Sequence, residues 1–305
     1  AAVPSSIASN VYNKLIYGDH ILANTPVGTV ASVESIVLYD LKDFYNSNFS
    51  ADLATISIVG DVTQSGAVKA FKGIVEKWNV NEVSFSEYEL PEPKKQAKVY
   101  FVDVPGAKQS EIRIGYLGLA RTDPDYYPAT MMNMKLGGNF SGDVNMVLRE
   151  EKGYTYGART GFSGSNFPGK FTASSGVRSN TTEESVNIFK ELLTAYRDPI
   201  ASDDLDFTKN VLLKSNARRF ETLGALRGMI SNIATYGFPF DYIKDQEETV
   251  RNMSVEDHNA LAKKLIRPDE MISLVVGDAA TQLEGMKSLG FGDPILLDAD
   301  GNPVQ

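Results

Sequence analysis

The chain has 305 residues, 42% hydrophobic and 23% charged, as in a globular protein of about two domains. Its 39 acidic and 30 basic residues give a net charge of −9, which argues against a sequence-independent nucleic-acid binder, because such a protein needs a basic surface. The lack of cysteine in the sequence excludes disulfides and thiolate zinc sites. Short apolar runs and no signal-peptide pattern at the start predict a soluble chain without a membrane span, whose compartment stays unknown.

A segment near the start of the chain is repeated near its end. Two segments match without gaps at a constant offset, which aligns Asp40 with Asp257 and Val59-Gly60-Asp61 with Val276-Gly277-Asp278. Each copy has the pattern of a helix, a turn, a short apolar strand and a Gly-Asp turn. In the first copy this strand is expected at residues 53–59. We interpret the match as a duplication.

A second set of elements follows a linker that contains Pro91 and Pro93. Strands are expected at 97–105 and 111–119, paired as a hairpin, and again at 154–162 and 170–177. Helices are expected near 126–136, 142–152, 182–196, 203–220, 222–236 and 254–266. A closing strand at 274–277 precedes a tail with the character of a loop.

This order of elements predicts an α+β fold in which helices pack on a mostly antiparallel sheet. The expected parts are the C-terminal remnant of a first α+β repeat (1–88), a linker (89–96), a complete second repeat (97–290) and a C-terminal tail (291–305). The first copy repeats only the end of the second unit. Roughly 130 residues of the first repeat would therefore lie upstream, and we expect the chain to be a fragment of something larger.

The sequence contains few motifs that are typical of catalytic, cofactor-binding or metal-binding sites. The sequence contains no Gly-rich phosphate loop and no Gly-x-Ser-x-Gly elbow. Its two histidines, His20 and His258, stand outside any metal-binding pattern. We therefore expect no metal ligand and no bound cofactor on this chain.

The candidate binding residues lie in residues 136–157. The helix near 142–152 would carry Arg149 at the edge of its apolar stripe. Tyr156 would lie on the next strand, on the same face as Ala158. The two side chains would converge beside an accessible strand edge, where a docked peptide gains backbone hydrogen bonds and the Arg and Tyr donors hold its carbonyl oxygens. From the residues alone, an ordinary surface role for Arg149 stays open.

This segment resembles the later, metal-free domain of the pitrilysin/insulinase family of zinc metallopeptidases, the inverzincins. The resemblance rests on Leu136-Gly-Gly, Leu148-Arg149-Glu150, Tyr156, Tyr236-Gly237, Asp257 and Val276-Gly277-Asp278, which span nearly the whole chain. In that family, repeated α+β domains form two halves around a chamber for unfolded peptides. One half binds zinc through His-x-x-Glu-His, which this sequence lacks, and an Arg and a Tyr of the other half help to orient the substrate.

The resemblance implies that Arg149 and Tyr156 bind substrate and that zinc is held by a partner half or partner subunit. The chain would then be the C-terminal, substrate-binding part of a zinc-dependent metalloendopeptidase that acts on unfolded peptides, inactive as an isolated chain. It would belong either to the metal-free half of one long enzyme or to the metal-free subunit of a pair. The alternatives are a non-catalytic structural core subunit of the same fold, as in respiratory complexes, and an unrelated peptide-binding module.

Overall fold

The computed structural model describes residues 3–304, apart from the side chain of residue 217. The chain divides into two compact units. The larger unit comprises the residues up to 24 together with 90–212 and 244–305, and the smaller unit comprises 25–89 and 213–243.

The larger unit is built on a six-stranded mixed sheet with the strand order β3-β4-β2-β5-β1-β6. Its strands are β1 (Lys98–Asp103), β2 (Gln109–Leu117), β3 (Thr155–Phe162), β4 (Lys170–Arg178), β5 (Ile272–Gly277) and β6 (Ile295–Leu297). The pairs β3–β4, β4–β2 and β2–β5 are antiparallel, whereas β5–β1 and β1–β6 are parallel. The predicted α+β fold, with helices on a mostly antiparallel sheet, is confirmed.

Strands β1 and β2 do not form the predicted hairpin, because β5 lies between them. All six residues of β5 are buried, and Leu274 and Val275 belong to the cores on opposite faces of the sheet. A strand that is apolar on both faces is most stable in the interior of a sheet that is covered on both sides. The tail, predicted to be a loop, contributes the edge strand β6.

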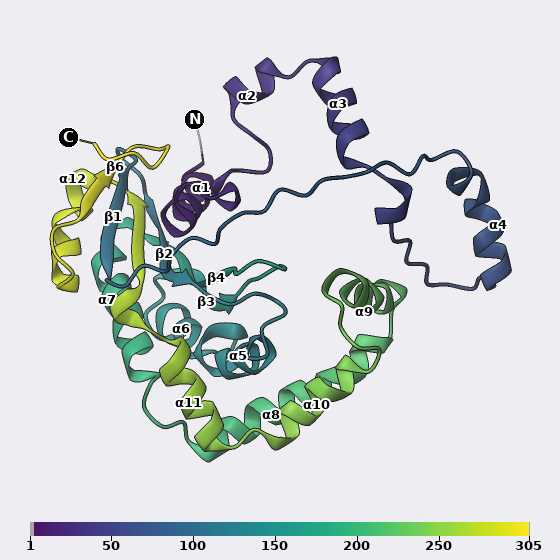
Figure 1. Cartoon of the computed structure of the whole chain (residues 1–305). Coiled ribbons are helices and arrows are strands. Elements are labelled where there is room, and N and C mark those ends of the chain that lie inside the picture. The colour runs from purple at the N-terminus through teal and green to yellow at the C-terminus, as the bar shows by residue number, and fades with distance from the viewer. Residues whose placement is uncertain (1–2, 305) are drawn as a thin grey trace. The chain divides into compact units, whose positions relative to one another are not determined.

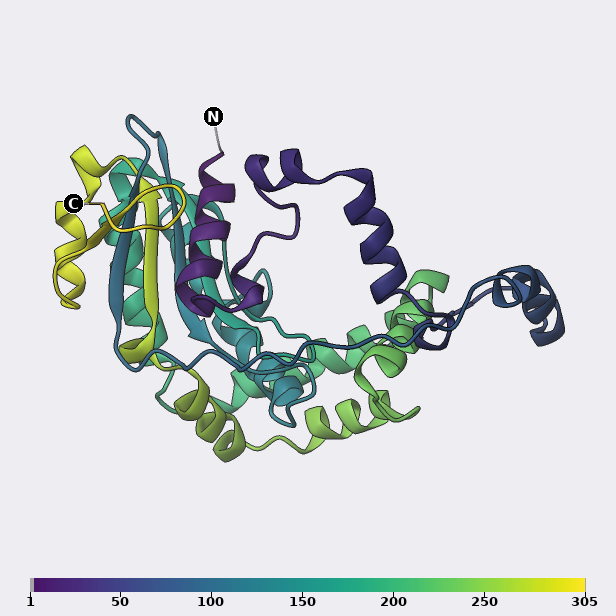
Figure 2. The same ribbon diagram turned by 45° about the horizontal axis from the view of Figure 1, so that its top comes forward.

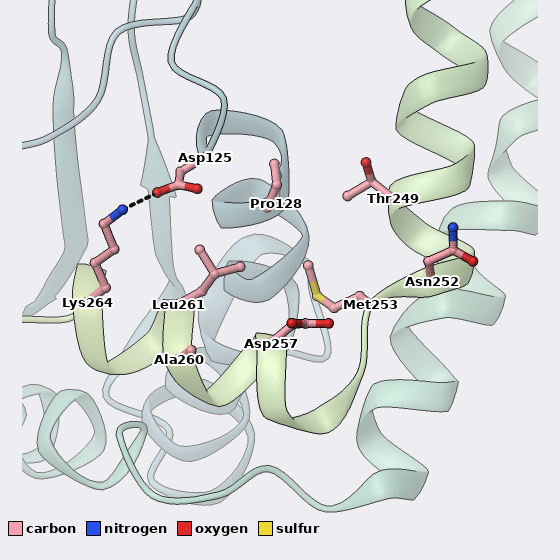
Figure 3. Close-up of a pocket in the computed structure, with 9 residues that line it drawn as sticks. All are labelled: Asp125, Pro128, Thr249, Asn252, Met253, Asp257, Ala260, Leu261 and Lys264. Atoms are coloured by element: carbon pink, nitrogen blue, oxygen red, sulfur yellow. Dashed lines mark hydrogen bonds and ion pairs between the residues drawn. The ribbon is translucent and has the colours of Figure 1, made fainter.

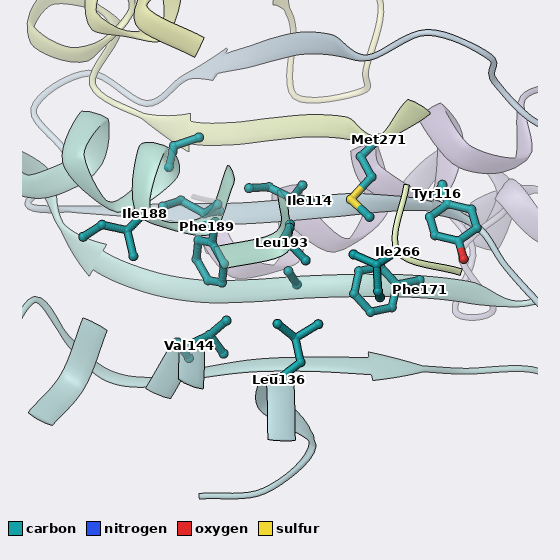
Figure 4. Close-up of a cluster of buried hydrophobic side chains, with 14 of the residues drawn as sticks. Ile114, Tyr116, Leu136, Val144, Phe171, Ile188, Phe189, Leu193, Ile266 and Met271 are labelled. Atoms are coloured by element: carbon teal, nitrogen blue, oxygen red, sulfur yellow. The ribbon is translucent and has the colours of Figure 1, made fainter. Parts of the chain in front are cut away.

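Helices cover both faces of the sheet (Figures 1 and 2). Helix α1 (Pro4–Tyr17) packs on one face, where Val11 and Tyr12 contact a core that includes Leu274. The other face is covered by α5 (Tyr126–Asn133), α6 (Asp143–Asn145), α7 (Thr182–Ala195) and α11 (Val255–Leu265). Figure 4 shows Phe171 and Phe189 in this second core, where both are fully buried. Burial of these aromatic and aliphatic side chains is the main favourable contribution to the stability of the unit.

The remaining helices are short or lie outside this layer. They are α2 (Val30–Ser35), α3 (Leu38–Asn48), α4 (Gln64–Val75), α8 (Ser202–Asn216), α9 (Leu223–Tyr236), α10 (Tyr242–Asn252) and α12 (Ala279–Gln282). Helices α8 and α10 each contain residues of both units. Helix α10 has no counterpart among the predicted elements.

The structure reproduces the helix of the sequence repeat. The bounds of α3 (Leu38–Asn48) and α11 (Val255–Leu265) correspond residue for residue at an offset of 255 − 38 = 217. In both helices the shared aspartate caps the first turn: Val37 N donates to Asp40 Oδ2 (2.8 Å), and Ser254 N donates to Asp257 Oδ2 (3.0 Å).

The copies differ at the strand that follows this helix. In the second copy it is β5, but the matching residues 55–60 form no strand, so the predicted strand at 53–59 is wrong. A strand needs a neighbour to accept and donate its backbone hydrogen bonds. Among the described residues of the smaller unit, no strand is available to pair with it.

We expect hydrogen exchange to be much faster in residues 25–89 than in β1, β2 and β5. Leu41 and Phe44 of α3 are 58% and 60% exposed, whereas Ala262 and Leu265 of α11 are 0% and 4% exposed. Helices with so little buried apolar surface open at low free energy. Exchange measured by mass spectrometry on the intact chain tests this. Equal protection of the two regions would contradict it and would show that residues 25–89 pack as a complete domain.

Candidate functional site

Arg149 lies on a short helical segment that is anchored to the core. Helix α6 continues as a π-helical turn, Met146–Glu151, whose Leu148 is fully buried. The Arg149 guanidinium lies over the ring of Phe140, with 4.6 Å between Cζ and the ring centroid. It also forms a 3.4 Å ion pair with Glu150, and its side chain is 36% exposed. The stacking orients the arginine while its remaining N–H groups stay available for a ligand.

Tyr156 lies in a β-bulge at the start of β3. Thr155 pairs with Val177 but Ala158 pairs with Ser175, so three steps along β3 match two along β4. The extra residue shifts the in–out alternation of the strand. Tyr156 is therefore 92% exposed, whereas Ala158 is 1% exposed. The prediction that these two residues share one face is wrong: the phenol ring lies in solvent.

The outer edge of β3 is closed by side chains from the helix layer. Three backbone groups on this edge are bonded: Ala158 N donates to Asn145 Oδ1 (3.1 Å), Asn133 Nδ2 donates to Thr160 O (2.9 Å), and Tyr126 Oη donates to Phe162 O (3.1 Å). A peptide adding a strand to β3 would need these groups. The predicted accessible strand edge is therefore wrong between Ala158 and Phe162.

Asn145 connects the surroundings of the two candidate residues. Its side chain is 4% exposed, and Nδ2 donates to Phe140 O (2.7 Å), the residue on which Arg149 stacks. Oδ1 accepts from Ala158 N, just after the bulge that carries Tyr156. The structure does not bring Arg149 and Tyr156 into direct contact: in the described chain they share no hydrogen bond, ion pair or ring contact.

Phe140 and Asn145 were missed in the sequence-based prediction. The available signals were weak. Phe140 is an aromatic residue in a loop of small and polar residues, and Asn145 is a polar residue beside the apolar Val144. Neither pattern by itself distinguishes a binding surface from ordinary packing.

The neighbouring tyrosine, Tyr154, has a different role. Its Oη donates to Glu184 (2.6 Å), which also accepts from Lys152 Nζ (2.9 Å). These two hydrogen bonds hold the pKa of Glu184 below its ordinary value, so that this carboxylate stays ionised at neutral pH. Tyr154 is therefore engaged within the protein. The Tyr156 hydroxyl, by contrast, has no hydrogen-bond partner among the described residues and can donate to a ligand.

The described residues do not fit a zinc site. Among them, no group of three or more His, Asp or Glu side chains is arranged to hold a metal ion. His20 Nδ1 accepts from Leu22 N (3.1 Å). His258 is 2% exposed, with Nε2 3.3 Å from Tyr196 Oη, and burial lowers the pKa of His258. Between residues 3 and 304, no helix has both the length and the apolar character needed to cross a membrane.

The mixed sheet, its helix layers, the half-buried Arg149 and the exposed Tyr156 define an α+β domain that holds no metal-binding group within the described residues. The signature of the family described as "Peptidase M16 inactive domain" matches residues 35–212, more than half of the chain, and the chain belongs to this family. The resemblance to the pitrilysin/insulinase zinc peptidases is thereby confirmed at the family level.

Several relatives support this assignment. The chain is 24% identical over 283 residues to "Uncharacterized zinc protease YmxG" of Bacillus subtilis, covering 89% of this chain and 66% of that protein. It is 22% identical to "Non-peptidase homolog YmxG" of Helicobacter pylori, covering 84% and 59%. Its structure is similar to that of a peptidase M16 inactive domain from Pseudomonas fluorescens, with a TM-score of 0.81, 26% identity and coverage of 90% and 66%. The chain thus spans less than two thirds of these curated relatives.

Proposed function

We propose that this chain is the metal-free, substrate-binding part of a zinc-dependent metalloendopeptidase that acts on unfolded peptides. The observation that carries the proposal is the presentation of Tyr156. A bulge turns its ring into solvent, and its hydroxyl has no partner among the described residues. The free hydroxyl offers a hydrogen-bond donor to a ligand, and membership in the peptidase M16 family supports a peptide as that ligand.

On this proposal the peptide is held by side-chain donors. Because the outer edge of β3 is covered between Ala158 and Phe162, strand addition at these residues is not available. The Tyr156 hydroxyl and the Arg149 guanidinium instead donate to carbonyl oxygens of the substrate. Phe140 keeps the guanidinium in a defined orientation through the stacking contact.

Zinc would be held by another half or subunit. The described residues offer no site for it, and the chain spans 59% to 66% of its curated relatives. Residues 1–88 would be the end of a first repeat that is completed elsewhere, in a longer polypeptide or a partner subunit. Residues 97–290 would form the complete second repeat, after the linker 89–96 and before the tail 291–305.

The test of this proposal is reconstitution. The purified chain is assayed on a fluorogenic unfolded peptide, alone and together with the zinc-bearing half or subunit encoded with it, and zinc is quantified after gel filtration. We expect no stoichiometric zinc and no cleavage for the chain alone, and cleavage above the rate of the zinc-bearing part in the mixture. A rate that the chain does not change would overturn the proposal.

A second candidate is a non-catalytic member of the same fold. The relative from Helicobacter pylori that is named a non-peptidase homolog favours it. In that case the chain would form a stable complex with its partner without any effect on peptide cleavage. The reconstitution experiment separates the two candidates, because gel filtration reports the complex and the fluorogenic peptide reports the activity.

A further inference from the structure

A cavity of about 440 Å³ lies in the larger unit, away from Arg149 and Tyr156 in the sequence. Three elements line it: the start of α5, the C-terminal end of α10 with the residue after it, and one face of α11. On α11 the lining residues are Asp257, Ala260, Leu261 and Lys264, at the spacing of one helical face. Its volume is in the range of sites that bind small ligands or single side chains.

The charged residues of the lining lie in two places, as Figure 3 shows: the pair of Asp125 and Lys264 on one side, and Asp257 nearer the middle. Lys264 Nζ forms a 2.5 Å ion pair with Asp125, so this lysine is already neutralised. Away from this pair, Asp257 Oδ2 accepts from Ser254 N (3.0 Å) and Ser254 Oγ (2.8 Å). These bonds lower the pKa of Asp257, which stays ionised at neutral pH. Within the described chain, no cationic side chain is paired with Asp257.

Much of the lining is apolar. Leu261 lies between Lys264 and Asp257, and Met253 lies beside Asp257, with the polar Thr249 and Asn252 beyond it. Beside the polar Thr249 and Asn252, the lining therefore combines an aliphatic surface with one carboxylate that has no cationic side chain paired with it in the described chain. This combination fits a side chain that has a long aliphatic stem and a cationic head.

We propose that this cavity binds a Lys or Arg side chain of a peptide, with the cationic head on Asp257 and the stem across Met253 and Leu261. The choice of a peptide rests on the proposed function, and the choice of a basic residue rests on charge complementarity with the lining. Bound away from the Arg149 and Tyr156 segment, a basic residue would hold a substrate at a second point and favour peptides that carry one.

The experiment measures binding of an unstructured fluorescent probe peptide, Gly-Ser-Leu-Arg-Leu-Ser-Gly, to the full chain by anisotropy. A matched probe carries citrulline in place of Arg, which has nearly the same shape but no charge. We expect the Arg probe to bind about 5-fold more tightly, as for a partly exposed charge pair, and the difference to shrink at high salt. Asp257→Asn should abolish the preference.

The internal repeat supplies the control variant. Asp40→Asn removes the same charge from the matching capping position of α3, but Asp40 does not line the cavity. It should keep the Arg preference. Ala260→Phe, at an exposed position that lines the cavity, should fill the space and weaken binding of both probes.

The outcomes separate this inference from the proposed function. Equal affinity of the two probes, no measurable binding by the wild-type chain, or the same loss in the Asp40 and Asp257 variants would each overturn it. An Arg preference that depends on Asp257, in a chain whose Tyr156→Phe variant keeps full activity, would support the cavity site and count against the site at Tyr156.

Discussion

Tyr156→Phe is expected to lower kcat/KM of the assembled peptidase by about 10²–10³-fold, the usual effect of losing one donor directed at developing charge. The hydroxyl has no partner among the described residues and the ring is 92% exposed, so its loss should leave the melting temperature and the zinc content unchanged. Kinetics on a fluorogenic unfolded peptide, with calorimetry on the same preparations, test this.

Arg149→Ala belongs to the same experiment and should have an effect of similar size. Arg149→Lys keeps the charge but loses the planar donors and the stacking on Phe140, so it should recover little activity. Arg159→Ala is the matched control. Arg159 is exposed on β3, the strand that carries Tyr156, but it is not proposed to bind the substrate. Full activity of the Tyr156 and Arg149 variants would remove the site assignment. Mild changes in KM alone would indicate ordinary binding contacts.

Asn145→Ala is expected to reduce both stability and activity. The change leaves Ala158 N without its side-chain partner in a buried setting, which costs about 1–3 kcal/mol, and it removes the part-buried hydrogen bond to Phe140 O. It also releases the loop under Arg149 and the strand next to the bulge, so we expect kcat/KM to fall by at least about 10-fold even well below the melting temperature.

Asn133→Ala provides the comparison. Asn133 is also buried, and it holds β3 through Thr160 rather than through Phe140 or the bulge. Its loss should lower the melting temperature by a similar amount and leave kcat/KM nearly unchanged. If both variants lose the same fraction of activity, Asn145 acts only through stability, and its proposed link to the two ligand-binding side chains is wrong.

The sequence by itself determined the local elements. Hydrophobic periodicity and capping residues act over three or four residues, so the helix at 254–266 was predicted within about one residue. The sequence repeat predicted the matching helix α3 in the first copy. The strands β3 and β4 were placed equally well. Arg149 and Tyr156 became candidates through the family resemblance rather than through spacing.

The tertiary structure decided which strands pair and which edges stay open. Strand β5, more than 150 residues after β2 in the chain, separates β1 from β2, and residues 55–60 form no strand where no partner is present. The bulge at Tyr156 and the bond from Ala158 N to Asn145 depend on β4 and α6. Pairing of this kind is fixed by contacts between segments that are distant in sequence. The hydrophobic pattern of one segment shows that it can form a strand, but it does not show which other segment will pair with it.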